Sequence, residues 1–186
     1  MNLFMPKSEV RPTMDLVKGA IFSSLGERIV GARVLDLFSG SGALGIEALS
    51  RGAASAVLVE KNAQAADTIR RNLEKTKLTA KVCQLDVFQF LTRVALEHEF
   101  DLIFADPPYA KKPDERDFGR ELIEHPALAR AIAPGGLFIL EQLPGTGTPE
   151  GTAWECIRLK RYGATEVALL ALPESNLEGG APATPG

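Results

Sequence analysis

Residues 33–45 read Arg33-Val34-Leu35-Asp36-Leu37-Phe38-Ser39-Gly40-Ser41-Gly42-Ala43-Leu44-Gly45. The first six residues are a short apolar run of strand length, and a helix is expected from Ala43 to about Arg51. Between them lies a literal G-x-G-x-x-G loop. A glycine loop between a strand and a helix is typical of a nucleotide-type cofactor site, because a ligand can approach the backbone at the helix N-terminus.

Strands and helices alternate along most of the chain. Further strands are expected at 56–60, 80–85, 101–105 and 137–141, with helices at 13–25, 62–73, 87–96 and up to about Ile132. Thr13 and Asn62 are placed to cap two of these helices. The segment Pro134-Gly135-Gly136 is expected to turn the chain into its fifth strand. Two β-rich runs at about 154–161 and 165–172 are joined around Gly163.

Five strands with helical crossovers predict a parallel, doubly wound, Rossmann-like α/β sheet. The terminal hairpin raises the total to seven strands, one of them antiparallel. The 186 residues correspond to one domain of ordinary size, and 45% hydrophobic residues suffice for a core. We expect this domain to span residues 1–172. Residues 173–186 have few apolar anchors and are expected to form a disordered tail.

Composition also excludes several classes of protein. Two cysteines do not form a disulfide scaffold and suit a reducing cytoplasm, where we expect the protein to reside. No apolar run approaches the ~18 residues of a membrane span. Two histidines and two distant cysteines argue against a zinc site. The net charge of −3 argues mildly against general polyanion binding.

Asp36 indicates which cofactor the glycine loop holds. It stands four residues before Gly40, near the carboxyl end of its strand. A carboxylate there repels the pyrophosphate of a dinucleotide. S-adenosylmethionine has no phosphate and carries a sulfonium and an ammonium group. The sequence therefore favours S-adenosylmethionine over NAD.

Two more acidic residues end the next two predicted strands. Glu60 is placed to accept hydrogen bonds from ribose hydroxyls, a contact that NAD enzymes share. Asp86, followed by Val87 and Phe88, is placed to reach the adenine amine with an apolar neighbour for the ring. Open α/β sheets bind ligands at the carboxyl ends of their strands, where these acids are expected to meet.

Asp106-Pro107-Pro108-Tyr109 follows the fourth predicted strand and opens on the same edge. Consecutive prolines stiffen the backbone. The Asp106 carboxylate and the Pro107 carbonyl then become two fixed acceptors for an exocyclic amine, a form of electrostatic preorganisation. Tyr109 is placed to stack on the base. These residues predict transfer of a methyl group to an amino nitrogen of a nucleobase.

The stretch from Val34 to Gly42, together with Asp106-Pro107-Pro108-Tyr109, resembles the class I methyltransferases that modify exocyclic amino nitrogens. Arg11-Pro12-Thr13, residues 42–53 and Arg161-Tyr162-Gly163 resemble the RsmD family more specifically. The resemblance covers about 10–172. That family methylates guanine N2 in bacterial small-subunit ribosomal RNA, so it implies an rRNA (guanine-N2)-methyltransferase that uses S-adenosylmethionine. A monomer acting on ribosomal RNA or the small ribosomal subunit is expected.

The resemblance also implies roles for individual residues. The cofactor site would comprise Asp36, Phe38, Gly40, Ser41, Gly42, Gly45, Glu60, Lys61, Asp86, Val87 and Phe88. The catalytic segment would comprise Asp106, Pro107, Pro108 and Tyr109. Arg11, Thr13, Tyr109 and Lys111 would contact the substrate.

The chain departs from the family before Arg11. Family members usually begin with a basic, Arg- and Gly-rich hairpin that is thought to grip RNA, whereas Lys7 is the sole basic residue among the first ten here. Two other basic groups could replace it. One comprises Lys61, Arg70, Arg71, Lys75, Lys77 and Lys81, and the other comprises Arg158, Lys160 and Arg161. Either group could instead be a solvated surface or a charge-guarded edge strand.

Three alternatives remain open at this point. A DNA adenine or cytosine amino-methyltransferase would use a similar tetrapeptide at residues 106–109. An NAD-dependent oxidoreductase would use the glycine loop but conflicts with Asp36. A non-catalytic RNA-binding factor could retain the fold, although Asp106 and Tyr109 argue against it.

Overall fold

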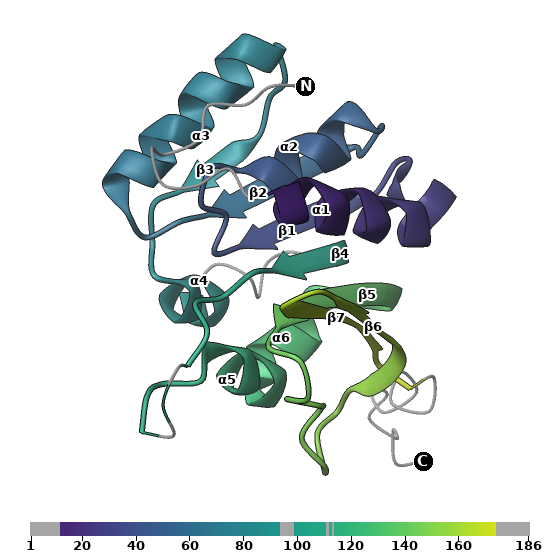
Figure 1. Cartoon of the computed structure of the whole chain (residues 1–186). Coiled ribbons are helices and arrows are strands. Elements are labelled where there is room, and N and C mark those ends of the chain that lie inside the picture. The colour runs from purple at the N-terminus through teal and green to yellow at the C-terminus, as the bar shows by residue number, and fades with distance from the viewer. Residues whose placement is uncertain (1–11, 94–98, 111, 113, 174–186) are drawn as a thin grey trace, which may run out of the picture.

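The fold is a three-layer α/β sandwich around one seven-stranded sheet (Figure 1). The computed structural model describes residues 12–93, 99–110, 112 and 114–173. The predictions for Arg11, Lys111 and nearly all of the tail lie outside these residues. The strands are β1 (Arg33–Leu37), β2 (Ser55–Val59), β3 (Lys81–Cys83), β4 (Phe100–Ala105), β5 (Ile132–Gln142), β6 (Glu155–Tyr162) and β7 (Thr165–Ala171).

The strands lie in the order β3-β2-β1-β4-β5-β7-β6. The pairs among β3, β2, β1, β4 and β5 are parallel, whereas β7 runs antiparallel to both of its neighbours. The predicted doubly wound sheet with one antiparallel strand is therefore confirmed. Strand β7, the last one described, lies between β5 and β6, so the hairpin connection leaves β6 at the edge of the sheet.

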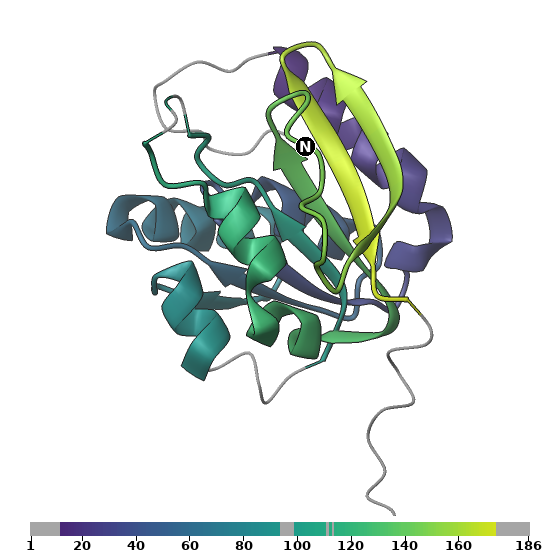
Figure 2. The same cartoon turned by 90° about the horizontal axis from the view of Figure 1, so that it is seen from below.

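Helices cover both faces of the sheet. They are α1 (Pro12–Leu25), a 3₁₀ helix η1 (Gly26–Ile29), α2 (Ala43–Ser50), α3 (Ala63–Thr76), α4 (Val87–Arg93), α5 (Phe118–Glu124) and α6 (Pro126–Ala131). One buried cluster contains apolar residues of α1, α2 and α3, and the other contains those of α4, α5 and α6. Figures 1 and 2 show these two sets of helices on opposite faces of the sheet.

The structure corrects two predicted boundaries in the second half of the chain. A single helix was expected up to Ile132, but α5 ends at Glu124 and α6 begins at Pro126, because proline disfavours a helix interior. His125 caps the new start, and its Nδ1 accepts a hydrogen bond from the backbone N–H of Ala127 at 3.2 Å. Strand β5 begins at Ile132 rather than at Leu137, so the predicted turn at 134–136 is an irregularity within a strand.

Of the two predicted N-cap residues, one is confirmed and the other is wrong. Asn62 caps α3 as predicted, since its side chain accepts a hydrogen bond from the backbone N–H of Ala65 at 3.0 Å. Thr13 does not stand at the N-cap, because α1 already begins at Pro12. Proline suits the first helical position because it has no N–H that would need a partner there. No described helix is long and apolar enough to cross a membrane.

Candidate active site

The candidate site begins where β1 ends. Asp36 is buried, with 2% of its surface exposed, and its Oδ2 accepts a hydrogen bond from the backbone N–H of Gly45 at 2.8 Å. This bond ties the end of β1 to the first turn of α2. Burial raises the pKa of Asp36 to about 7, and the nearby carboxylates of Asp106 and Glu60 add to the rise, while the Gly45 bond opposes it.

The three glycines of the loop are required for different structural reasons. A Cβ on Gly42 would lie 2.9 Å from Leu58 Cδ2, and one on Gly45 would lie 3.1 Å from Asp36 Oδ2, so both positions are filled by packing. Gly40 and Gly42 both have a positive φ, of +54° and +79°, but of the three glycines only Gly40 has open space where a Cβ would point. A ligand can therefore approach the backbone at Gly40.

Glu60 joins the glycine loop to the end of β2. Its Oε2 accepts the backbone N–H of Gly40 at 2.9 Å, and its Oε1 accepts the backbone N–H of Asn62 at 2.7 Å. Each carboxylate oxygen has a second lone pair, so the half-buried Glu60 can still accept hydroxyl donors.

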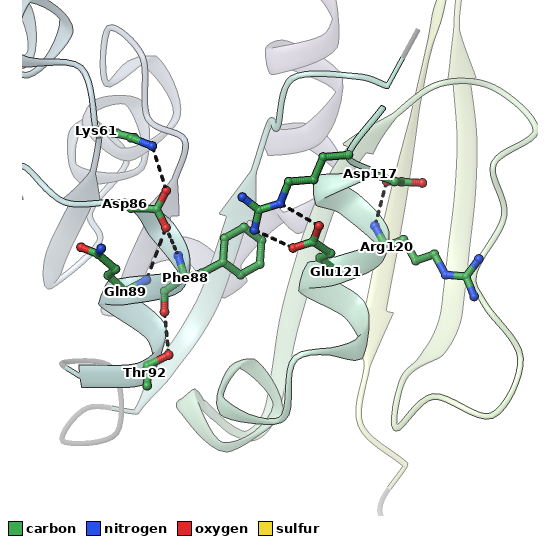
Figure 3. A network of polar contacts seen from close by, with 9 residues as sticks. Lys61, Asp86, Phe88, Gln89, Thr92, Asp117, Arg120 and Glu121 are labelled. Atoms are coloured by element: carbon green, nitrogen blue, oxygen red, sulfur yellow. Dashed lines mark hydrogen bonds and ion pairs between the residues drawn. The ribbon is translucent and has the colours of Figure 1, made fainter. Parts of the chain in front are cut away.

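Asp86 closes this edge at the end of β3. Its Oδ1 accepts the backbone N–H of Phe88 at 3.0 Å and so caps α4, while its Oδ2 lies 3.4 Å from Lys61 Nζ (Figure 3). Lys61 is mostly exposed and is placed by this ion pair. The side chain of Val87 is buried in the same core cluster as Phe90, so it does not line the open edge.

Three aromatic rings and one guanidinium gather beside Asp86; Phe38 and Phe88 were predicted for this site, whereas Phe118 and Arg116 were not. Phe118 lies 6.2 Å from Phe88 and 5.6 Å from Phe38, measured between ring centroids. The Arg116 guanidinium lies 4.6 Å from the Phe88 centroid and 4.7 Å from that of Phe118. Glu121 holds it with two contacts of 2.7 Å, on the side of α5 that faces α4 (Figure 3). Sequence spacing gives no signal for this group, because its rings come from three separate elements.

The segment after β4 lies beside the glycine loop because β4 pairs with β1. Leu37 is the register partner of Ala105, so the residues that follow each strand share one edge. Pro107 is buried, Pro108 is exposed and Tyr109 is half-buried. A small cavity of about 60 Å³ adjoins Pro107, Pro108 and Tyr109, and a larger hollow of about 380 Å³ continues from it between α5 and residues 142–150.

Tyr109 is held by hydrogen bonds from its hydroxyl to side chains of β5 and β7. Its hydroxyl lies 2.7 Å from Thr165 Oγ1 and donates to Glu141 Oε1 at 3.2 Å, and the Thr165 hydroxyl also lies 2.9 Å from Glu141 Oε1. Partial burial is the main cause that raises the pKa of Tyr109, so its phenol stays neutral. The ring is thereby fixed in position without being ionised.

Asp106 is exposed as a residue, but its carboxyl group is closely surrounded by protein atoms. Water reaches the residue, yet the protein atoms that line the concave edge desolvate its carboxyl and raise its pKa to about 7, with a further contribution from Glu141. Solvent screening moderates this rise while the site is open. Asp36, Glu60, Asp106 and Glu141 together make the site strongly acidic, which suits a cationic ligand.

The structure places most of the predicted site residues on this one edge. Ser41 is buried, and its carbonyl accepts a hydrogen bond from the Asn72 side chain at 3.0 Å. Thr13 lies in the first turn of α1. Among the described residues, no group of three His, Cys, Asp or Glu side chains is arranged to hold a metal ion.

Two residues that hold Tyr109 were missed for different reasons. Glu141 ends a predicted parallel strand, so the rule that selected Asp36, Glu60 and Asp86 would have found it. Thr165 begins an antiparallel strand, and only the insertion of β7 beside β5 brings it to the site.

Comparisons with known proteins agree with this architecture. The Escherichia coli K12 protein named Ribosomal RNA small subunit methyltransferase D is 40% identical over 103 residues, which are 55% of this chain and 51% of that protein. A solved hypothetical protein from Thermus thermophilus is 32% identical, with a TM-score of 0.74, and the match covers 91% of this chain and 92% of that one. The T. thermophilus 16S rRNA N2 methyltransferase RsmC, solved with AdoMet and guanosine, is 26% identical with a TM-score of 0.67, over 89% of this chain and 44% of that one.

The matched segment spans about half the length of the curated relatives. A family model covers far more of this chain, since residues 2–171 match the family described as Conserved hypothetical protein 95. The resemblance to the RsmD family found in the sequence is confirmed by the curated relatives and by this model. The chain belongs to the family Conserved hypothetical protein 95.

Proposed function

We propose that this protein is an S-adenosylmethionine-dependent methyltransferase that modifies guanine N2 of small-subunit ribosomal RNA. The main support is the juxtaposition of two loops on adjacent strands. The acidic glycine loop after β1 lies next to the Asp106–Tyr109 segment after β4. The names of the E. coli and T. thermophilus relatives support the reaction class and the rRNA substrate.

The residues present fit this cofactor. The open backbone at Gly40 and the carboxylate of Asp36 suit its cationic methionine end, while Glu60 suits the ribose and Asp86 with Phe88 suits the adenine. The carboxyl-end edge of the sheet that would hold the cofactor is also shaped by Phe38, Ser41, Gly42, Gly45 and Lys61. Val87 supports this edge from the core. When bound, the cofactor supplies an electrophilic methyl group, which is transferred to nitrogen with release of S-adenosylhomocysteine.

The residues after β4 would orient the base. The Asp106 carboxylate and the Pro107 carbonyl accept the two N–H donors of the guanine amino group, which directs its lone pair toward the methyl group. Tyr109, fixed by Glu141 and Thr165, stacks on the base plane. As the N–C bond forms, the nitrogen loses a proton, and a carboxylate whose pKa is about 7 can accept it. The target base must leave its stack to reach this site.

The test uses labelled S-adenosylmethionine with separate pools of small ribosomal subunits, naked ribosomal RNA and DNA, all lacking the modification. Digestion to nucleosides locates the label. We expect it in N2-methylguanosine from an RNA pool. D106N should retain cofactor binding and lose about 10²–10³-fold in transfer rate.

Three outcomes would contradict the proposal. Label confined to adenine or cytosine of DNA would move the substrate to the rival amino-methyltransferase class. Tight binding of NAD in place of S-adenosylmethionine would identify an oxidoreductase. Cofactor binding without transfer to any pool would indicate a non-catalytic factor.

A further inference from the structure

Strand β6 is a basic edge strand that no other described element covers. Every residue from Glu155 to Arg161 is exposed, including Ile157 at 52% and Leu159 at 48%. Arg158, Lys160 and Arg161 lie here against one acidic residue, Glu155. None of these three basic side chains forms a salt bridge with the parts of the chain that the structure describes. Their charge is therefore available to an external anion.

One row of this strand leads to the target-base site. Arg158, Lys160 and Tyr162 pair with Leu169, Val167 and Thr165 of β7, so the three side chains lie on the same face of the sheet as Thr165. Thr165 is the residue whose hydroxyl lies 2.7 Å from that of Tyr109. The row spans about 13 Å at the usual rise of a strand, and it ends beside the tyrosine anchor.

Tyr162 is the end of this row nearest the site. The Lys160 ammonium lies 5.3 Å from its ring centroid, a cation–π arrangement. Its ring also packs partly against the cluster that includes α1 residues, and α1 runs alongside the β6–β7 hairpin (Figure 2). The Lys160 ammonium is thus positioned by an aromatic ring of the same row.

The other basic group, which comprises Lys61 and the basic residues from Arg70 to Lys81, lies at the opposite end of the sheet. Arg70 and Arg71 belong to α3, which packs beside β3, and five strands separate β3 from β6 in the sheet order. Arg70 is paired with Asp67 at 2.6 Å, and Lys61 with Asp86 at 3.4 Å. The α3 side of the sheet adjoins the cofactor edge, whereas β6 adjoins the target-base residues.

We propose that Arg158 and Lys160, with Tyr162 beside them, bind the phosphate backbone of the single-stranded RNA that flanks the target guanine. This inference rests on the proposed function and names the surface that docks its substrate. Arg158 and Lys160 form no salt bridge with the described residues, and their row ends at Tyr162, opposite the Thr165 that contacts Tyr109, on which the base would stack. Phosphate contacts position a nucleic acid without reading its sequence, which is what exposed arginine and lysine side chains do.

The test compares R158E/K160E with R70E/R71E, a matched charge reversal on α3. RNA affinity is measured by filter binding over a range of salt concentrations, and cofactor affinity by calorimetry. We expect R158E/K160E to weaken RNA binding at least tenfold at physiological salt and to reduce the slope of log K against log salt by about 1.4, because two phosphate contacts are lost. R70E/R71E should change RNA affinity less than twofold, and both variants should keep the cofactor affinity of the wild type.

A neutral variant and a second substrate sharpen the comparison. R158Q/K160Q should give an intermediate loss, since it removes the attraction without adding repulsion. Unchanged affinity and slope in R158E/K160E would overturn the proposal, as would an equal loss in R70E/R71E. A loss seen with assembled subunits but not with naked RNA would assign β6 to a ribosomal protein and would also overturn it. Binding is read without turnover, so a failure of the proposed methyl transfer is recognised separately.

Discussion

Asp36 shows at the scale of one residue how a buried acid is held in place. Its unfolded pKa is about 3.9 and its folded pKa about 7, so the folded protein binds this proton more tightly. Stability from this group is therefore present at low pH and is lost as the pH rises toward 7. The hydrogen bond from Gly45 compensates only part of the burial cost.

We predict that D36N removes this pH dependence, because an amide oxygen can still accept the Gly45 N–H and carries no charge. Between pH 5.5 and 8, the free energy of unfolding of D36N should rise relative to the wild type by about 2 kcal/mol. Urea titrations at both pH values measure this change. The exposed control D114N should keep a constant difference from the wild type, and a similar constant difference for D36N would refute the assignment.

Asp106 gives a prediction about rate. Its carboxylate must be ionised to accept one N–H of the amino group and then the departing proton, and its pKa is about 7. With saturating cofactor, single-turnover transfer should rise about tenfold from pH 6 to pH 8. D106N should be slower at every pH and show no such rise. A wild-type rate that does not change over this range would argue against proton acceptance by Asp106.

The sequence predicts the site residues unevenly. Asp36 lies near the end of β1, and Glu60, Asp86 and Asp106 follow β2, β3 and β4; a parallel sheet brings such positions to one edge. Glu141 obeys the same rule near the end of β5. Arg116 and Thr165 gain their roles from contacts across elements, Arg116 with Phe88 of α4 and Thr165 with Glu141 of β5. No local pattern encodes those contacts.

At the scale of the element, the first turn of α2 is held in place by close packing around Gly45. Gly45 lies in the helix and fits between Leu58 and Asp36, and a Cβ there would lie 3.0 Å from Leu58 Cγ. Gly19 lies in α1 and has open space around it. Two helical glycines therefore differ only in what surrounds them.

We expect alanine at these two positions to act with opposite signs. G45A should destabilise the fold by about 1–3 kcal/mol through overpacking and should weaken cofactor binding. G19A should stabilise it by about 0.5–1 kcal/mol, because alanine is the better helix former. Thermal unfolding and calorimetric cofactor titration measure both effects. Equal effects of the two substitutions would show that Gly45 is not held by its packing.

The ends of helices and strands were predictable where the capping and turn residues agree with the spacing of the apolar residues. Asn62 opens α3 and Gly52 follows α2, as their residue types predict. Residues 134–136 contain a proline and two glycines and suggest a turn. Ile132 pairs with Phe100, and pairing resumes at Leu137 opposite Leu102, so residues 134–136 form an irregularity between two paired parts of β5. Pairing with β4 on both sides keeps this irregularity within the strand.

At the scale of the whole molecule, Trp154 reports on the half of the sheet that the hairpin completes. It is the sole tryptophan, is 6% exposed, and its ring centroid lies 5.3 Å from that of Phe138 on β5. Far-UV circular dichroism reports instead on all helices and strands. The two probes therefore distinguish one cooperative unit from two.

We predict that residues 1–172 unfold as a single domain. Trp154 fluorescence and circular dichroism should give the same urea midpoint and the same slope. An earlier fluorescence transition would show that β5, β6 and β7 separate from the rest of the sheet. The doubly wound topology itself was predictable from the alternation of elements, whereas the place of β7 between β5 and β6 was not.

The position of β7 has a consequence for the order in which the protein is made. Chains fold largely from the N-terminus during synthesis. The glycine loop and its acids can form once residues 33–93 have been translated, but the anchor of Tyr109 waits for Thr165, which belongs to β7, the last strand that the structure describes. If the protein methylates ribosomal RNA as proposed, the ribosome that translates it completes the target-base site of the new chain only after β7 has been made.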